Sequence, residues 1–457
     1  MRRRFLFGLI SLVILLPGYP QSRKWTLEEC VQYAIDHNIT IRQQEINTLY
    51  NKNQLRQTRI GQLPSLNGNT NYSYQRGRAL DQSTYSFTQK VNYVGLNLNS
   101  SLTLFNGLQN RNTLKQQRYI LEASLQDLQK AKNDISLNVA LAYLQILLDK
   151  ELLEVAENQL EVTQQQIERT KELVEAGSLA RGSLYEIEAQ AASEEVQLIN
   201  ARNALDIAYL DMTQLLELDS TEGFEIIVPE INIPDSGYVI PPVNLVYSDA
   251  MNLMPQVKSA ELGVKRSEMN LLIAKGARMP RLSMNGSFNT YFSDNLKKVL
   301  GVDPVTGIIY GNYPFGEQFK DNQTWGITLG LMIPIFNGWQ VKTGVDNARL
   351  NLDNAKYQYD FTSKQLYKEI QQAYADAGGA LKRYLASQRT VASALESFRY
   401  NEEKFNVGLI NTVDYNASKN QLTQAQSDML SAKYEFFFKV NVLEFYRGKP
   451  FKLDIQF

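Results

Sequence analysis

Two long stretches of the chain carry apolar residues at spacings of three and four, the pattern of a helix with one buried face. In the first stretch these residues are Leu121, Leu125, Leu128, Ile135, Val139, Ala142, Ile146 and Leu153. The pattern predicts a helix over 108–176, roughly 100 Å long at about 1.5 Å per residue. It also predicts a twin over 339–407 that could bend at Gly378-Gly379. Helices of this length indicate a coiled coil or a helical barrel.

Four shorter segments alternate apolar and polar residues with a period of two, as strands do. They span 64–78, 91–105, 280–292 and 322–336. In the last segment the apolar face comprises Trp325, Ile327, Leu329, Leu331, Ile333 and Ile335. About 9–11 tilted residues suffice to cross a bilayer, and uncharged polar faces suit a water-filled lumen. A soluble β-sandwich with one wet face is the alternative.

The two long helices belong to an internal repeat. Leu104-Phe105-Asn106-Gly107 recurs 231 residues later as Ile335-Phe336-Asn337-Gly338. The same offset relates two further pairs, Ala142-Tyr143 with Ala373-Tyr374 and Gly177 with Gly408. Three matches at one offset indicate a duplication. Pro64 and Pro280 are only 216 residues apart, so the second copy holds about 15 extra residues, which we place in a loop at 293–321.

The repeat predicts the domain organisation of an α+β chain. Each copy contains a leading helical segment, a strand pair, a long helix, a glycine turn and a return helix. The expected parts are a signal peptide at 1–22, a first repeat at 23–217 with its return helix at 183–217, a proline-rich linker at 218–243, a second repeat at 244–446 with its return helix at 412–446, and a C-terminal tail at 447–457.

The first residues have the features of an export signal. Arg2, Arg3 and Arg4 precede an apolar run from Phe5 to Leu16, which is too short for an ordinary membrane-spanning helix. We place cleavage near Ser22, and an uncleaved N-terminal anchor is the alternative. Removal of 1–22 deletes three arginines and no acids, so the formal net charge changes from −1 to −4.

Composition points away from nucleic acid and from catalysis. A net charge of −1 provides no basic surface for nucleic acid. Cys30 is the only cysteine, so no intrachain disulfide is expected, and His37 is the only histidine. The chain has no phosphate-binding glycine loop and no zinc-protease or nucleophile-elbow motif. We therefore predict a protein that is not an enzyme, with no catalytic residues, no metal site and no cofactor.

The strand count has a consequence for assembly. Four strands cannot close a membrane barrel, because the smallest known barrels need about eight. If the strands enter a membrane, several copies must combine, and three copies supply twelve strands.

This order of elements resembles the TolC outer-membrane efflux family. The segment Trp25–Ala34 is similar to the start of that family, as are Leu104-Phe105-Asn106-Gly107 and the turn 405–409. The resemblance implies a homotrimer whose twelve-stranded β-barrel, with four strands per chain, lies in outer-membrane lipid and continues into a long α-helical barrel in the periplasm of a Gram-negative bacterium. It also implies a periplasmic adaptor and an inner-membrane transporter as partners.

The resemblance carries over to two groups of residues. The glycine turns would form the periplasmic tip and contact the adaptor through Ala176, Gly177, Ser178, Val407, Gly408 and Leu409. Phe405 and Asp414 would belong to the gate. The family's arginine and second aspartate are replaced here by Ile410 and Ala417. Three Asp414 carboxylates near a threefold axis would repel one another and could bind cations.

Three functions fit these features. The leading hypothesis is a passive exit duct for small molecules in a tripartite efflux system, with energy from the inner-membrane pump. The second is the exit duct of a type I protein secretion system. The third, from a different class, is a periplasmic adaptor with a coiled-coil hairpin. The sequence does not identify the transported substrate.

Overall fold

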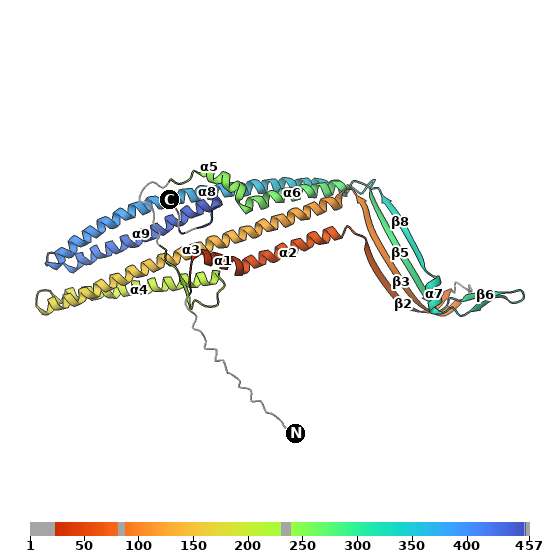
Figure 1. Cartoon of the computed structure of the whole chain (residues 1–457), viewed down its shortest axis with the longest axis horizontal. Helices are drawn as coiled ribbons and strands as arrows, with labels where there is room; N and C mark the ends of the chain where they lie inside the picture. Colours follow the sequence, from red (N-terminus) through yellow and green to blue (C-terminus); the bar gives the residue numbers. More distant parts are fainter. Residues whose placement is uncertain (1–22, 81–86, 230–238, 452, 454–457) are drawn as a thin grey trace, which may run out of the picture. The chain divides into compact units, whose positions relative to one another are not determined.

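A computed structural model describes residues 23–80, 87–229, 239–451 and 453 (Figure 1). The predicted signal peptide at 1–22, much of the predicted linker and part of the predicted tail lie outside the described residues. The chain divides into two compact units. The helical unit comprises Met1–Gln44, Leu128–Met254 and Lys364–Phe457, and the strand unit comprises Glu45–Asp127 and Pro255–Ser363.

The strand unit contains a four-stranded antiparallel sheet in the order β2-β3-β5-β8 (Figure 1). Its strands are β2 (Ser65–Leu80), β3 (Phe87–Asn106), β5 (Arg281–Ser293) and β8 (Thr324–Met332). Among the described residues, β2 and β8 each pair with a strand on one side only. The apolar residues of β8 are exposed, with Trp325 at 78% and Ile327 at 68%. The sheet therefore has two open edges and an uncovered apolar row.

The predicted strand 322–336 is too long, since β8 ends at Met332. Pro334 lacks the backbone N–H that a strand ladder requires, so pairing stops just before it. The predicted loop at 293–321 is also more structured than expected. It contains a hairpin of β6 (Lys298–Asp303) and β7 (Gly307–Gly311), followed by the short helix α7 (Phe315–Asp321).

Helix α7 is fixed to the end of β5 by one buried side chain. Gln318 is fully buried, and its Nε2 donates to the carbonyl oxygens of Ser293 at 3.0 Å and Tyr313 at 2.7 Å. Its Oε1 accepts from the Ser293 N–H at 2.9 Å. The hydroxyl of Thr290 donates to the Phe319 carbonyl at 2.7 Å. These hydrogen bonds satisfy the backbone N–H and C=O groups at the end of the strand.

Long helices make up most of the rest of the chain. They are α1 (Leu27–His37), α2 (Ile39–Ile60), α3 (Gln109–Glu175), α4 (Arg181–Leu215), α5 (Val243–Leu253), α6 (Pro255–Gly276), α8 (Gln340–Asn406) and α9 (Thr412–Tyr446). Helices α3 and α8 have 67 residues each, and α4 and α9 have 35 each. The first and last residues of both pairs are 231 residues apart. Helix α8 continues through Gly378-Gly379. No helix in the described part of the chain is both long and apolar enough to cross a membrane.

The passage from β3 into α3 depends on a glycine. Gly107 and Leu108 both have a φ of 64°, so the chain turns through the left-handed region before the helix begins. A Cβ atom on Gly107 would lie 2.3 Å from the carbonyl oxygen of Gly276. Only glycine permits both the backbone angle and this close approach of α6. The turn between strand and helix is therefore specified by a single residue type.

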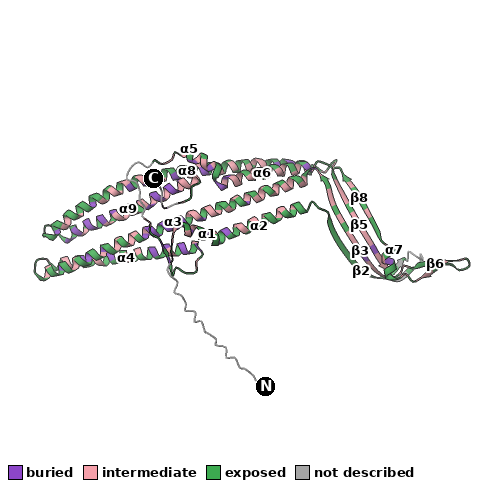
Figure 2. Ribbon diagram, in the orientation of Figure 1, coloured by how far each residue is buried: buried purple, intermediate pink, exposed green. Residues whose placement is uncertain are grey.

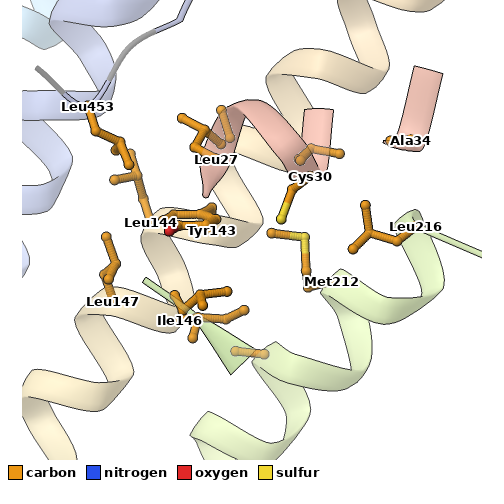
Figure 3. Close-up of a cluster of buried hydrophobic side chains, with 14 of the residues drawn as sticks. Leu27, Cys30, Ala34, Tyr143, Leu144, Ile146, Leu147, Met212, Leu216 and Leu453 are labelled. Carbon is orange, nitrogen blue, oxygen red and sulfur yellow. The ribbon is translucent and has the colours of Figure 1, made fainter. Parts of the chain in front are cut away.

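The core of the helical unit surrounds Tyr143 (Figure 3). Leu27 and Cys30 from α1, Ile146 from α3 and Met212 from α4 are fully buried in it. Burial raises the pKa of the Cys30 thiol to about 12. The short strand β1 (Arg23–Trp25) pairs in parallel with β4 (Phe224–Ile226), and Phe224 and Ile226 of β4 belong to this core. This short pairing ties the start of the described chain to the segment that follows α4.

Tyr143 connects this strand pair to α3. Its hydroxyl reaches the carbonyl oxygen of Ile227 at 2.5 Å and that of Trp25 at 3.2 Å. The change Tyr143→Phe keeps the ring but removes the donor, so we expect the free energy of unfolding to fall by about 1–2 kcal/mol. Denaturant titration followed by circular dichroism measures this loss. Tyr185→Phe is the control because Tyr185 is 67% exposed, and an equal loss in both variants would contradict the assignment.

Candidate functional site

Two glycine turns connect the long helices to their return helices, and both have the same hydrogen bonds. In the first turn, Gly177 N–H donates to Val174 O at 3.0 Å and Ser178 N–H donates to Leu173 O at 2.8 Å. In the second turn, Gly408 and Leu409 donate to the carbonyls of Phe405 and Lys404 at 3.0 and 2.8 Å. This is the Schellman arrangement, which needs a left-handed residue after the helix.

The glycines meet that requirement with φ values of 72° at Gly177 and 75° at Gly408. The residues predicted to contact an adaptor are Ala176, Gly177, Ser178, Val407, Gly408 and Leu409, and all of them are exposed (Figure 2). Val407 and Leu409 are 70% and 74% exposed, so the second turn presents two bare apolar side chains. The first turn presents only alanine, glycine and serine. The two turns therefore have the same backbone conformation but expose different side chains.

The helices that follow the turns also begin differently. The side chain of Asn411 accepts a hydrogen bond from the Asp414 N–H at 2.8 Å and so caps α9. Ala180 precedes α4 and provides no side-chain cap. The Asp414 carboxylate is exposed in the first turn of α9, where the helix dipole favours a negative charge.

Phe405 does not project from the turn. It is 9% exposed and packs in a cluster with Ile187 of α4 and Tyr415 of α9. Its ring stacks on that of Tyr415 with centroids 4.7 Å apart. Burial raises the pKa of the Tyr415 phenol to about 12. This cluster, which we call the tip cluster, joins the hairpin α3–α4 to the hairpin α8–α9 close to both turns.

A second contact between the hairpins is polar and deeply buried. Lys419 of α9 and Glu194 of α4 form an ion pair at 3.3 Å with side chains only 5% and 1% exposed. The Lys419 ammonium also donates to the Gln159 carbonyl of α3 at 2.8 Å and to the hydroxyl of Thr163. Each of its three protons thus has an acceptor.

The Glu194 carboxylate is equally well satisfied. It accepts from Gln159 Nε2 at 3.0 Å, from Gln190 Nε2 at 2.9 Å and from the hydroxyl of Thr163. Burial lowers the pKa of Lys419, while the Glu194 carboxylate opposes that shift by favouring the charged amine. We call the side chains of Gln159, Thr163, Gln190, Glu194, Lys419 and Thr423 the buried polar network. The exposed Asn420 lies at its edge, where its Oδ1 accepts from Gln190 Nε2 at 2.9 Å. Sequence inspection missed the network, because charged residues at helical spacing are usually solvated.

The described residues contain no group of three or more His, Cys, Asp or Glu side chains arranged to hold a metal ion. The tip cluster and the buried polar network each join the hairpin α3–α4 to the hairpin α8–α9, and the exposed turns lie close to the tip cluster.

A model of one protein family, described as outer membrane efflux protein, matches residues 30–217 and 246–446. The chain belongs to the outer membrane efflux protein family. The match runs through both hairpins, both glycine turns and all four strands of the sheet. It confirms the resemblance drawn from the sequence, and it identifies the chain as an outer-membrane efflux protein.

Individual members of the efflux family are distant from this chain in sequence. The outer membrane efflux protein BepC of Brucella suis is 20% identical over 81% of this chain and 74% of its own length. The cation efflux system protein CusC of Escherichia coli O157:H7 is 22% identical over 78% of this chain and 73% of its own length. The outer membrane protein TolC of Escherichia coli K12 is 21% identical over 69% of this chain and 62% of its own length.

Solved structures of efflux channels share the fold. A crystal structure of CusC superposes with a TM-score of 0.76 at 18% identity, covering 92% of this chain and 91% of that one. The outer membrane protein VceC of Vibrio cholerae gives a TM-score of 0.76 at 17% identity, covering 93% and 97%. The fold is therefore that of a TolC-like channel, mostly helical with a smaller sheet.

Proposed function

We propose that this chain forms the outer-membrane exit duct of a tripartite efflux system. The observation that carries the proposal is the geometry of the sheet. The edges of β2 and β8 are open, and an apolar row on β8 is exposed, in a chain that belongs to the efflux family. Exposed strand edges lead to uncontrolled association unless they are paired. Pairing β8 of one copy with β2 of the next in a homotrimer closes a twelve-stranded barrel, and the apolar row then faces lipid.

The same proposal includes an internal two-fold repeat, with 23–217 and 244–446 as its copies. The 231-residue offset of α3 to α8 and of α4 to α9 supports it. Two hairpins per chain give six in a trimer, and twelve helices can enclose a tunnel that continues the barrel. The chain acts as a passive conduit, and an inner-membrane transporter supplies the energy.

The glycine turns are the proposed docking points for a periplasmic adaptor. The exposed Val407 and Leu409 side chains support this role for the second turn, because small apolar side chains on a rigid turn suit a protein contact. The first turn would contribute mainly its backbone at Ala176, Gly177 and Ser178. Phe405 acts in the gate by packing the tip cluster, while the exposed Asp414 supplies charge.

The relatives indicate a class of function, efflux across the outer membrane, but they do not identify the transported substrate. Membership of the efflux family favours a duct over a periplasmic adaptor. CusC is a cation efflux protein by name, whereas BepC and TolC are named without a substrate. We propose small molecules as cargo, with protein secretion as the other use of the same duct.

Conductance across planar lipid bilayers tests the proposal. The purified full chain in detergent should migrate as a heat-sensitive trimer and insert to give discrete, uniform conductance steps. A chain that remains a soluble monomer without detergent, and gives no conductance, would overturn the proposed function.

The role of Asp414 has a test of its own. If three Asp414 carboxylates meet near the threefold axis, divalent cations should block the channel, and Asp414→Asn should weaken that block by about tenfold or more, equivalent to about 1.4 kcal/mol. Single-channel recording at several divalent cation concentrations measures this. Asp219→Asn is the control, because it removes an exposed carboxylate outside the helices. Equal block in the wild-type chain and in Asp414→Asn would refute the role.

A further inference from the structure

A cavity of about 890 Å³ lies in the helical unit, where α4 ends and α2 begins. Its walls come from these two helices and from α3. Asn38 Nδ2 donates to the Leu215 carbonyl at 3.2 Å, and the Glu217 carboxylate accepts from the Ile39 N–H at 3.2 Å. These bonds hold the two helix ends together and so fix one wall of the cavity. The volume is typical of sites for small molecules, which occupy about 300–1,000 Å³.

The cavity combines apolar walls with acidic groups. Asp211 and Glu217 are its charged residues, and no lysine, arginine or histidine is among the described residues that line it. Ile39 and Leu141 are 56% and 48% exposed, so apolar surface is open to a ligand. The apolar residues that line the cavity are Ile39, Ile135, Leu141, Ala142, Ala208 and Leu215.

The acids at this cavity have no cationic partner in the described part of the chain. The Asp211 carboxylate takes part in no ion pair or hydrogen bond with the described residues. Gln145, which lines the cavity, donates its Nε2 to both carboxylate oxygens of Asp149 at 3.0 and 3.1 Å. Asp149 is 6% exposed, and burial raises the pKa of its carboxyl group. A positive charge brought into the cavity would therefore lie close to acids that lack one.

The second hairpin shows what fills the equivalent place. At the 231-residue offset, Ala208 corresponds to Lys439 and Gln145 corresponds to Asp376. Lys439 Nζ of α9 and Asp376 Oδ2 of α8 form an ion pair at 2.9 Å. Leu215 corresponds in the same way to the larger Tyr446. The second hairpin thus has an ammonium group and an aromatic ring where the first hairpin has only a methyl group and a leucine.

We infer that this cavity binds an organic cation, with an ammonium group beside Asp211 and an apolar body against Leu141 and Leu215. The ligand would take the place that the Lys439 ammonium and the Tyr446 ring fill in the second hairpin. The site goes beyond the proposed duct, since all of its walls belong to the helical unit of a single chain.

Other classes of ligand fit this cavity less well. An anion would lie against Asp211 and Glu217 with no base to balance it. A hydrated metal ion would leave the apolar walls uncovered, and the described residues hold no metal-binding group of three His, Cys, Asp or Glu. A neutral apolar molecule would displace water from the carboxylates without replacing its hydrogen bonds. An amine on an apolar body satisfies both kinds of wall.

Ligand-observed NMR of the full chain in detergent tests the site. Phenethylamine is the probe and phenethyl alcohol is its neutral counterpart, because both have the same ring and only the amine is charged at neutral pH. The amine should bind saturably, at one site per chain, and at least tenfold more tightly than the alcohol. Empty detergent micelles measure the partition of both compounds, which is subtracted.

Two variants locate the binding. Asp211→Asn should weaken phenethylamine binding about tenfold, because it removes the charge that faces the ammonium. Asp206→Asn is the matched control and should leave binding unchanged, since Asp206 is an exposed carboxylate of α4 that does not line the cavity. Ala208→Lys should abolish binding, because its own ammonium would occupy the cavity as Lys439 does in the second hairpin.

Far-UV circular dichroism verifies that the variants are folded, and if Ala208→Lys is not, Asp211→Asn decides alone. Equal affinities for the amine and the alcohol, an unchanged affinity in Asp211→Asn, or the lack of saturable binding would each overturn the inference. These results leave the proposed duct untouched, because trimer formation and conductance are measured separately.

Discussion

Replacing Lys419 with methionine is expected to lower the free energy of unfolding by about 3–5 kcal/mol, which is the usual cost of leaving one member of a buried ion pair alone. Glu194 is 1% exposed and would remain next to Gln159 and Thr163 without the ammonium that pairs with it. Denaturant titration of the full chain in detergent, followed by far-UV circular dichroism, measures the change. A companion variant with Lys419→Leu, Glu194→Ala and Thr163→Ala should recover most of the loss.

Two of these three changes place alanine where the second hairpin has it, since Ala394 and Ala425 lie 231 residues after Thr163 and Glu194 and pack with Leu422. The matched control is Lys433→Met, because the Lys433–Glu151 pair has the same 3.3 Å separation but side chains 20% and 28% exposed. Water screens that pair, so its loss should cost about 1 kcal/mol or less. Equal losses in Lys419→Met and Lys433→Met would show that burial of the network has no special energetic weight.

Phe405→Ala is expected to loosen the tip cluster, with a local cost of about 3–4 kcal/mol for removing a buried aromatic ring. The ring stacks on Tyr415 and contacts Ile187 of the other hairpin, so the separation of the two hairpins near the turns should become easier. Hydrogen exchange monitored by mass spectrometry should show faster exchange in 398–416, while the core around Tyr143 stays protected.

The matched control for that variant is Val407→Ala. Val407 lies two residues away but is 70% exposed, so its truncation removes little packing. Unchanged exchange in Phe405→Ala, or equal acceleration in both variants, would show that the tip cluster does not hold the hairpins together. The pair of variants also separates the two roles proposed near this turn, since Val407 is proposed to dock an adaptor and Phe405 packs in the tip cluster.

Much of the fold follows from local patterns. The predicted helices 108–176 and 339–407 differ from α3 and α8 by one residue at each end, because a period of three and four and the glycines at 177 and 408 set both the helix and its stop. The strands were placed by alternation, but their ends were not. Strand β8 ends before Pro334, earlier than predicted. Strand β2 continues to Leu80 rather than to residue 78, and β3 begins at Phe87 rather than at residue 91.

Other features depend on residues far apart in the chain, and no local pattern indicates them. The parallel pairing of β1 with β4 joins segments about 200 residues apart. The buried polar network draws Gln159, Glu194 and Lys419 from three helices. One sequence signal was available for the network. At the 231-residue offset Glu194 corresponds to Ala425 and Lys419 corresponds to Glu188, so neither charge is matched in the other half of the chain.

The sequence by itself determined the period and the length of the long helices and the resemblance to the family. The helix pattern depends only on neighbours within a few residues, and the 231-residue offset is found by direct comparison of two stretches of the chain. Only the tertiary structure decided which charged side chains are buried and which apolar side chains are exposed. Lys419 and Glu188 occupy equivalent positions on equal helices, yet one is enclosed by two other helices and the other is exposed. Burial is set by what packs against a helix face, and for Lys419 that partner is the hairpin α3–α4, far away in the chain.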